Sequence, residues 1–391
     1  MNGTHRKRVA IAIPYAYLDS MPGVKSLCNI LAEPGNLIDI YTIKKENYTT
    51  PTFASEFIRV IIYGEVFRGI KSGASGVLFF LKYFIFYAKS IIASLNRYDM
   101  HVGIGLRGGV IAVIAARILR RHSVYYSMEL YCTEKSTSKK NWVNSLVEGM
   151  VFKLANVILI QDLSRAEIIK KHYALGDNKI AILPNSINTF AKRNKTTYLY
   201  DEHEIPYNLN ILLYIGALSD TCRVLELVKG FQRVPDNWVL VVHSKWDGYD
   251  KAIEGYINKL KAAANNRVII RTKAVALDQL TELIDSADVG VALYDSKSMN
   301  VHEVGLSSGK IGHYLASGLP IVVSSQESLS IFTENCRAGI TINGGDELAA
   351  ALDTIKSDYE GYVQRSVACY NKYYSIENYK YSVLKATKCS D

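Results

Sequence analysis

The feature that most constrains the fold is a repeated alternation of short, β-branched apolar runs with segments of helical periodicity. The first series of apolar runs lies at 9–15, 36–43, 99–106, 123–130, 156–162 and 179–185. Continuous apolar runs that alternate with helices are typical of βαβ units, whose parallel sheet is covered on both faces. We therefore expect an α/β fold.

The alternation occurs twice. A polar, unpatterned stretch at 188–208 is followed by a second series of runs at 210–218, 238–244, 267–273, 289–295 and 320–325. Because 391 residues exceed one ordinary core, we expect two doubly wound, Rossmann-like domains. The expected division is an N-terminal domain at 1–190, a linker at 191–208, a C-terminal domain at 209–355 and a helical tail at 356–391 that packs back toward the N-terminal domain. Ligands of such sheets bind beyond the carboxyl ends of the strands, which favours a central cleft between the two domains.

The net charge and the cysteine content restrict the partners and the cellular compartment that we expect for the protein. The net charge of +9 suits phosphorylated ligands, anionic membranes or nucleic acid, but no nucleic-acid-binding module is recognisable, so we expect no nucleic-acid partner. The six cysteines include no CxxC pair and are expected to be free thiols in a reducing compartment. The N-terminus lacks a secretory pattern, so the expected location is cytoplasmic.

One long apolar segment, GVLFFLKYFIFYAKSIIASL (76–95), has two interpretations. It approaches the length of a membrane span, but Lys82 and Lys89 interrupt it, and no span is expected. It is either a buried core helix or a helix that docks on an anionic membrane surface with its lysines near lipid phosphates. The second interpretation makes the protein peripheral at the inner face of the cell membrane.

The stretch SSGKIGHYLASGLPIVVSS (307–325) indicates an anion site. Ser307, Ser308 and Gly309 precede an apolar-periodic helix, and Lys310 adds a positive charge. Free N–H groups and the positive end of the dipole favour an anion at a helix N-terminus. We expect a phosphate there; the alternative is an ordinary serine cap with a solvated lysine.

The segments LPNSIN, LLYIGAL and SADVGVALYDS, together with SSGKIGHYLASGLPIVVS, resemble the GT-B glycosyltransferases that use nucleotide-sugar donors. The likeness extends over most of the chain in layout, is specific mainly at 282–325, and is greatest to the retaining "glycosyl transferases group 1" family of bacterial surface-polysaccharide assembly. It implies a hexosyltransferase that moves a sugar from a nucleotide diphosphate sugar to a hydroxyl of a saccharide acceptor carried on a lipid such as polyprenyl diphosphate. A UDP-sugar is favoured over a GDP-sugar, and no further cofactor is implied. Because the chain contains no Asp-x-Asp pair, we expect no metal ion.

The resemblance also implies roles for residues in and before the 307–325 helix. Relatives commonly carry one glutamate that binds the ribose and another, eight residues earlier, near the donor sugar. His313 and Gly305 stand at these positions. His313 is expected to bond the ribose hydroxyls unless it is packed in the core. Glu303, two residues from the second position, is expected to contact the sugar unless it is a solvated loop residue.

Two basic residues of the family are also replaced. Relatives commonly have arginine directly after the glycine of the LLYIGAL turn and lysine five residues later, where this chain has Ala217 and Cys222. Arg223 is the candidate replacement, since a guanidinium can bind two phosphate oxygens; otherwise it is a surface residue. Lys273, at the end of an expected strand, is a further candidate.

Two candidates lie in the N-terminal domain. Gly23 matches the glycine loop that lies against donor phosphates and acceptor in the family, or it is a simple turn glycine. Glu129 ends an expected strand and is a candidate catalytic base for the acceptor hydroxyl; it could equally orient the acceptor. Retention or inversion at the sugar is left open.

The replacements at Ala217, Cys222, Gly305 and His313 keep two other functions open. One is a non-catalytic GT-B scaffold of a polysaccharide assembly complex. The other is a sugar-nucleotide epimerase, which would require further acid and base residues.

Overall fold

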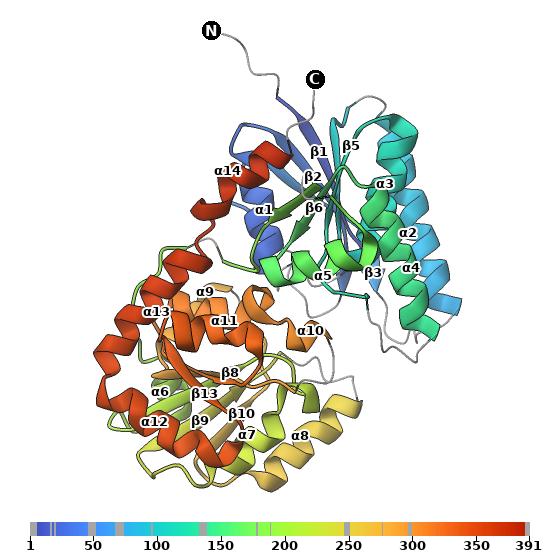
Figure 1. Ribbon diagram of the computed structural model, residues 1–391. Coiled ribbons are helices and arrows are strands. Elements are labelled where there is room, and N and C mark those ends of the chain that lie inside the picture. The colour runs from blue at the N-terminus through green and yellow to red at the C-terminus, as the bar shows by residue number, and fades with distance from the viewer. Residues whose placement is uncertain are drawn as a thin grey trace. The chain divides into compact units, whose positions relative to one another are not determined.

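The chain forms two compact units, shown in a computed structural model (Figure 1). Unit 1 comprises Met1–Asn185 and Ile376–Asp391, and unit 2 comprises Ser186–Ser375. The structure describes residues 6–15, 18, 21–45, 52–66, 74–94, 97–132, 139–176, 179–187, 189–245, 251–275, 277–295 and 299–387. Each unit contains one parallel sheet with helices on its faces, so the expected α/β fold with two Rossmann-like domains is confirmed.

Unit 1 has a seven-stranded parallel sheet with the order β3-β2-β1-β4-β5-β6-β7. Its strands are β1 (Arg8–Ile13), β2 (Leu37–Lys45), β3 (Ile58–Val66), β4 (Met100–Ile104), β5 (His122–Tyr126), β6 (Val157–Ile160) and β7 (Ile180–Ile182). Its helices are α1 (Pro22–Ala32), α2 (Ala74–Ala93), α3 (Gly105–Leu119), α4 (Lys139–Leu154), α5 (Leu163–Tyr173) and α14 (Glu377–Ala386). The order reverses between β1 and β4, which makes their carboxyl ends the switch point where ligands of such sheets bind.

Side chains of β1 show how both faces of this sheet are covered. Val9 and Ile11 belong to a core that includes Val383 of α14. Ala10 and Ala12 point to the opposite face and pack in a second core with α2. Hydrophobic residues must therefore occupy successive positions of the strand, which explains its unbroken apolar run.

The strand β3 was not expected, since the apolar runs taken as strands pass from 36–43 directly to 99–106. Its sequence, IRVIIYGEV, is rich in β-branched residues, and it pairs in parallel with β2 at the sheet edge. An edge strand is only partly covered, and Ile62 accordingly remains partly exposed.

Unit 2 has a six-stranded parallel sheet with the order β10-β9-β8-β11-β12-β13. Its strands are β8 (Asn210–Ile215), β9 (Trp238–His243), β10 (Val268–Arg271), β11 (Val289–Ala292), β12 (Ile321–Ser324) and β13 (Gly339–Ile342). Its α-helices are α6 (Tyr198–His203), α7 (Val224–Phe231), α8 (Lys251–Ala263), α9 (Leu277–Asp285), α10 (Met299–His302), α11 (Gly309–Ala316), α12 (Leu348–Ser357) and α13 (Tyr359–Tyr373). The switch point lies between β8 and β11, and β13 was not expected from the sequence.

The helix α2 packs in the core of unit 1, as one of the two expectations for segment 76–95 has it, and docking on a membrane stays a prediction. Within this segment the side chains before Leu81 and residue 95 lie outside the described residues. Tyr83 and Tyr87 are fully buried in the core of unit 1. Lys82 and Lys89 are exposed. In the part of the chain that the structure describes, no helix combines the length and the apolar character needed to cross a membrane.

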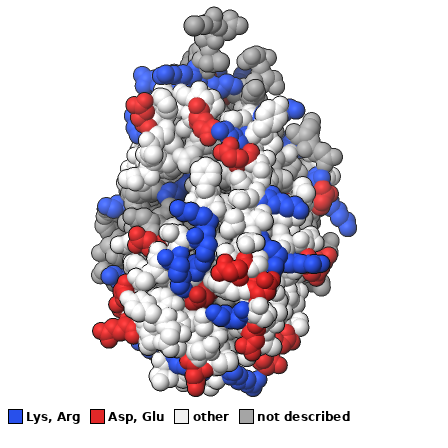
Figure 2. Space-filling view, turned by 90° about the vertical axis from the view of Figure 1, so that its left-hand side faces the viewer, with Lys and Arg blue, Asp and Glu red and all other residues white. Residues whose placement is uncertain are grey.

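Charged side chains of both signs share the surface that Figure 2 displays. Lys and Arg side chains are interspersed there with Asp and Glu, as expected for basic residues that are scattered along the sequence.

The stretch expected to be a linker is instead part of unit 2. It contains α6, and Leu199, Tyr200 and Ile205 are buried in the core of this unit. The expected tail is likewise divided, because α13 packs in unit 2 and α14 belongs to unit 1. The sequence did not indicate these contacts, because the segment 188–208 is mostly polar and contains few apolar residues.

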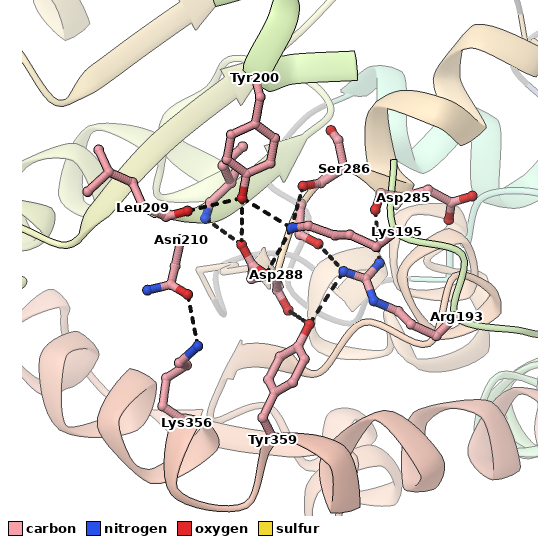
Figure 3. A network of polar contacts seen from close by, with 12 residues as sticks. Arg193, Lys195, Tyr200, Leu209, Asn210, Asp285, Ser286, Asp288, Lys356 and Tyr359 are labelled. Atoms are coloured by element: carbon pink, nitrogen blue, oxygen red, sulfur yellow. Dashed lines mark hydrogen bonds and ion pairs between the residues drawn. The ribbon is translucent and has the colours of Figure 1, made fainter. Parts of the chain in front are cut away.

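A polar network anchors the former linker at the amino ends of β8 and β11 (Figure 3). Asp288 accepts hydrogen bonds from the Ile211 amide at 2.8 Å and from Lys195 Nζ at 2.9 Å. Arg193 donates to the carbonyl oxygens of Asp285 and Ala287 at 3.0 and 2.6 Å. The network is structural, since ligands of parallel sheets bind at the opposite strand ends.

Candidate functional site

The start of α11, beyond the carboxyl ends of β8 and β11, holds the residues expected to bind an anion. Ser308 caps the helix: its Oγ accepts a hydrogen bond from the Ile311 amide at 3.4 Å and lies 2.8 Å from the Tyr294 hydroxyl. Ser307 donates to the Val304 carbonyl at 2.6 Å. An α-helix offers its first amides no internal acceptor, so the N–H groups of Gly309 and Lys310 remain for a ligand.

Lys310 is the central residue of this site. Its Nζ is buried and has no hydrogen-bond partner among the described residues. The ammonium lies 4.3 Å from the centre of the Tyr214 ring and 5.0 Å from that of Tyr294. Burial lowers the pKa of Lys310 to about 8. A buried ammonium that only aromatic rings compensate is poised to bind an anion.

Gly216 leaves the space that this ammonium occupies. Its φ of +136° lies in a region that other residues rarely adopt. A Cβ at this position would stand 3.0 Å from Lys310 Nζ. Cys222, which stands where relatives carry a lysine, is close enough for its thiol to affect the pKa of Lys310. The ammonium of Lys310 therefore lies near Cys222, where the resemblance led us to look for a lysine.

His313 and Glu303 occupy positions near this helix start. His313 lies one turn into α11 and is buried, and burial lowers its pKa to about 4. It is therefore neutral and able to hydrogen-bond a hydroxyl. The Glu303 side chain is largely covered, and its Oε1 lies 2.9 Å from His302 Nδ1. Their roles toward ribose and sugar stay predictions.

Arg223 is already engaged. Its Nε and Nη2 donate to the two carboxylate oxygens of Glu226 at 2.8 and 2.6 Å, and Nη2 also donates to the Asn343 carbonyl at 2.5 Å. The pairing raises the pKa of Arg223 and lowers that of Glu226. These contacts use Nε and Nη2 and fix the guanidinium locally. A phosphate contact through Nη1 stays a prediction.

Lys273 lies in the loop after β10 and is exposed. The loop is anchored by Arg271, which was not singled out from the sequence. Arg271 donates to the Lys273 carbonyl at 2.9 Å, to Glu202 at 2.7 and 2.9 Å, and to His243 Nδ1 at 3.0 Å. Lys273 is thus held at the carboxyl edge of the sheet, and its contact with a ligand stays a prediction.

In unit 1, Glu129 lies in the loop that follows β5. The side chain is exposed, but the surrounding protein displaces water from it and raises its pKa, while Arg165 acts in the opposite sense. Tyr15, which follows β1, has its pKa raised to about 12 by burial and by the nearby Tyr131, with a smaller effect of Glu129. Residues that follow β1 and β5, the two strands on either side of β4, are thereby brought together.

Glu148 of α4 supports this loop from within the unit and is fully buried. Its carboxylate accepts hydrogen bonds from the Tyr125 hydroxyl at 3.1 Å, the Ser127 hydroxyl at 3.3 Å and the Tyr131 amide at 3.1 Å. Burial raises its pKa to about 7. Sequence reasoning missed this residue, although it is the only acidic residue of α4.

Two further side chains hydrogen-bond the backbone of the loop that carries Glu129: Arg165 of α5 and Gln161, which lies just before α5. Gln161 Nε2 donates to the Ser127 carbonyl at 2.6 Å, and Arg165 Nη1 donates to the Met128 carbonyl at 3.3 Å. Arg165 is itself buried. Three buried polar side chains therefore fix the backbone on which Glu129 stands.

Gly23 is explained by packing. Its amide donates to Asn185 Oδ1 at 3.0 Å. A Cβ would stand 2.8 Å from the Tyr126 hydroxyl. The glycine thus allows α1 to approach β5 closely, and its N–H is occupied; a contact with phosphate is not needed to account for it.

A metal site is not apparent in the described part of the chain. No group of three or more His, Cys, Asp or Glu side chains there is arranged to hold an ion.

The sequence of unit 2 is similar to that of a known protein family. Residues 241–381 match the sequence model of the family described as "Glucosyltransferase 3-like, C-terminal domain". A sequence search of curated proteins gives no significant match.

Solved structures match over nearly the whole chain. Sucrose-phosphate synthase from Thermosynechococcus elongatus has a TM-score of 0.74 at 15% identity, covering 97% of this chain and 98% of that one. Anabaena HepE in complex with UDP and glucose has a TM-score of 0.68 at 14% identity, covering 97% and 99%. WaaG, a glycosyltransferase involved in lipopolysaccharide biosynthesis, has a TM-score of 0.66 at 13% identity, covering 97% and 100%.

These matches confirm the resemblance read from the sequence. The chain has the GT-B fold, and its residues 241–381 are similar to the glucosyltransferase 3-like C-terminal domain.

Proposed function

We propose that the protein is a glycosyltransferase that moves a hexose from a nucleotide diphosphate sugar to a hydroxyl of a saccharide acceptor, with unit 2 binding the donor. The observation that carries this proposal is the buried ammonium of Lys310 in the first turn of α11, which has no hydrogen-bond partner in the described part of the chain. The UDP and UDP-glucose complexes of HepE support a UDP-sugar as donor.

In this proposal the diphosphate binds at the start of α11. The first amides of the helix and Lys310 meet the charge that develops on the leaving diphosphate, and the hydroxyls of Ser307 and Ser308 hold that helix start in place. Donors that are already in place stabilise such charge without reorganisation. His313 contacts the ribose hydroxyls and Glu303 the sugar, and the chemistry proposed here needs no metal ion.

Unit 1 supplies the acceptor side. Glu129, with a raised pKa, receives the proton of the acceptor hydroxyl or orients that hydroxyl. The neighbouring Tyr15 and Tyr131 offer aromatic surfaces for a sugar ring. We further propose that the acceptor is carried on a lipid diphosphate at the cytoplasmic face of a membrane, to which the basic charge of the chain is suited.

Calorimetry with UDP, GDP, CDP and dTDP tests the donor site, each with and without EDTA. We expect UDP to bind the wild type whether or not EDTA is present, and Lys310→Met to bind it about tenfold to a hundredfold more weakly. Lys261→Met, an exposed lysine of α8, is the matched control and should bind as the wild type does.

Incubation with UDP-glucose separates the remaining functions. Transfer to an added saccharide supports the proposal, whereas conversion of the UDP-sugar without an acceptor would identify an epimerase. If a well-folded protein binds none of the four nucleotides, the donor site is refuted and the scaffold becomes the better reading.

A further inference from the structure

Three helices of unit 1 expose an unusual amount of apolar surface. Among the described residues, ten of the sixteen exposed large hydrophobic side chains lie on α2, α3 and α4. They are Leu81, Ile85, Ile92, Ile114, Ile118, Trp142, Val143, Leu146, Met150 and Leu154. We call this set the apolar helical face. Surface hydrophobic residues are ordinary when single, but a concentration of this kind marks an interaction site.

The three helices are neighbours on one face of the sheet, where Figure 1 shows them grouped. Arg117, near the end of α3, donates to the Leu154 carbonyl at the end of α4, at 3.3 Å from Nε and 2.8 Å from Nη2. The exposed residues of α4 include Leu146, Met150 and Leu154, which are four apart and share one side of the helix. The apolar helical face therefore lies on adjacent helices, with α2 beside α3 and α3 tied to α4.

The opposite sides of these helices already fill the core, so the exposed residues are surplus to folding. Tyr83 and Tyr87 of α2, Ile111 of α3 and Phe152 of α4 are all fully buried. A helix that needs only one buried stripe normally presents polar residues on the other side. These helices present apolar residues on both.

Charge restricts the partner of this face. Helices α2 and α3 contain no acidic residue, and the only one in α4, Glu148, is 0% exposed. The exposed charges of the three helices that the structure describes are all basic: Lys82, Lys89, Arg107, Arg117 and Lys153. The surface shown in Figure 2 mixes both signs instead. A second copy of the chain would bring like charges together, whereas an anionic surface complements them.

We propose that the apolar helical face docks on an anionic lipid bilayer. Aliphatic side chains enter the headgroup boundary, the basic side chains lie beside lipid phosphates, and Trp142 is a residue type favoured at such interfaces. The set extends beyond segment 76–95, because seven of its ten members lie on α3 and α4. It is independent of the donor site, and it would place the enzyme on the surface where a lipid-carried acceptor resides.

Vesicle flotation tests this proposal with the full chain. Vesicles of phosphatidylcholine alone are compared with vesicles that also contain phosphatidylglycerol, at low and high salt. We expect binding to the anionic vesicles only, and weaker binding at high salt. The double variant Lys82→Glu and Lys89→Glu should bind at least about fivefold more weakly for each lysine. The double variant Ile118→Ser and Met150→Ser should also bind more weakly.

Matched controls lie on α14, which covers the other face of the sheet. Tyr381 is 76% exposed, close to the 74% of Ile118, and Lys385 is exposed. Tyr381→Ser and Lys385→Glu should bind vesicles as the wild type does. Equal binding by all variants, or no binding by the wild type, refutes the membrane surface.

A dimer that the Ile118→Ser and Met150→Ser variant loses in light scattering would also overturn the proposal, because it would make this face a contact between copies. UDP calorimetry on the same variants keeps the two proposals apart, since the donor site lies in unit 2 and should be unaffected.

Discussion

Replacing Lys310 by methionine should stabilise the ligand-free protein and weaken nucleotide binding. Methionine keeps most of the apolar stem and removes the ammonium. The lowered pKa, about 8 against 10.5, corresponds to about 3 kcal/mol of destabilised charge at neutral pH, at about 1.4 kcal/mol per pH unit. Loss of the contacts with the Tyr214 and Tyr294 rings returns about 1–2 kcal/mol. The expected net gain is about 1–2 kcal/mol in the free energy of unfolding.

Binding should change in the opposite direction. A hydrogen bond between an ammonium and a phosphate contributes about 1.5–3 kcal/mol, so the variant should bind UDP about tenfold to a hundredfold more weakly. Urea unfolding without ligand and calorimetry with UDP measure the two quantities. The Lys261→Met control should change neither.

Proton uptake gives an independent check. In the wild type a bound diphosphate should raise the pKa of Lys310, so UDP binding takes up protons between about pH 8 and 10, which calorimetry in buffers of different ionisation enthalpy detects. Without ligand, the unfolded chain holds this proton more tightly, and stability therefore rises as the pH increases from about 8 to 10.5. A variant that is less stable than the wild type, and that still binds UDP, would refute the reasoning and make Lys310 a structural residue.

Three further predictions follow from the two sites. If Glu129 is the base, Glu129→Gln should lower kcat about 10²–10⁴-fold and leave the affinity for UDP unchanged. A rise confined to the acceptor KM would make Glu129 an orienting residue. Glu167→Gln, at an exposed position, serves as the control. Glu148→Gln should become more stable relative to the wild type as the pH rises from about 4.5 to 7, because the folded wild type keeps the Glu148 proton to a higher pH than the unfolded chain does. Urea unfolding across this range should show a difference in unfolding free energy that approaches about 3 kcal/mol. A stability difference that does not change with pH would contradict this prediction. Gly216→Ala should cost about 1–2 kcal/mol for the positive φ and weaken UDP binding by crowding Lys310, whereas wild-type affinity in calorimetry would show that the ammonium does not face the ligand.

The sequence predicted the alternation of strands and helices well because each buried strand is an unbroken apolar run. It failed at β3 and β13, which lie at sheet edges. Strand β3 stands close before an apolar helix, and β13 includes a glycine and a threonine and is only half buried, so it lacks an unbroken apolar run. It failed again at the expected linker, where few apolar residues, such as Leu199 and Ile205, decide which unit the segment joins.

The candidate site shows a similar limit. The pattern of serines, glycine and lysine at 307–310 predicted a helix start with a nearby charge. It could not show that Lys310 folds back over Tyr214, nearly a hundred residues earlier, because that contact depends on how β8 and β11 are paired. The loop of Glu129 depends likewise on Glu148, which the chain places on the next helix.

The return of the chain to unit 1 has a consequence for biosynthesis. Unit 2 is one continuous stretch, Ser186–Ser375, whereas unit 1 is completed only by Ile376–Asp391. On the ribosome, unit 2 can close as soon as it emerges, while unit 1 must wait with part of its core uncovered until α14 is made. A chain that ends before residue 376 would leave the surfaces of α1 and β7 that α14 packs against open to water. A chain that terminates early would therefore carry a folded unit 2 and an incompletely folded unit 1. Chaperones and proteases recognise such partly folded chains.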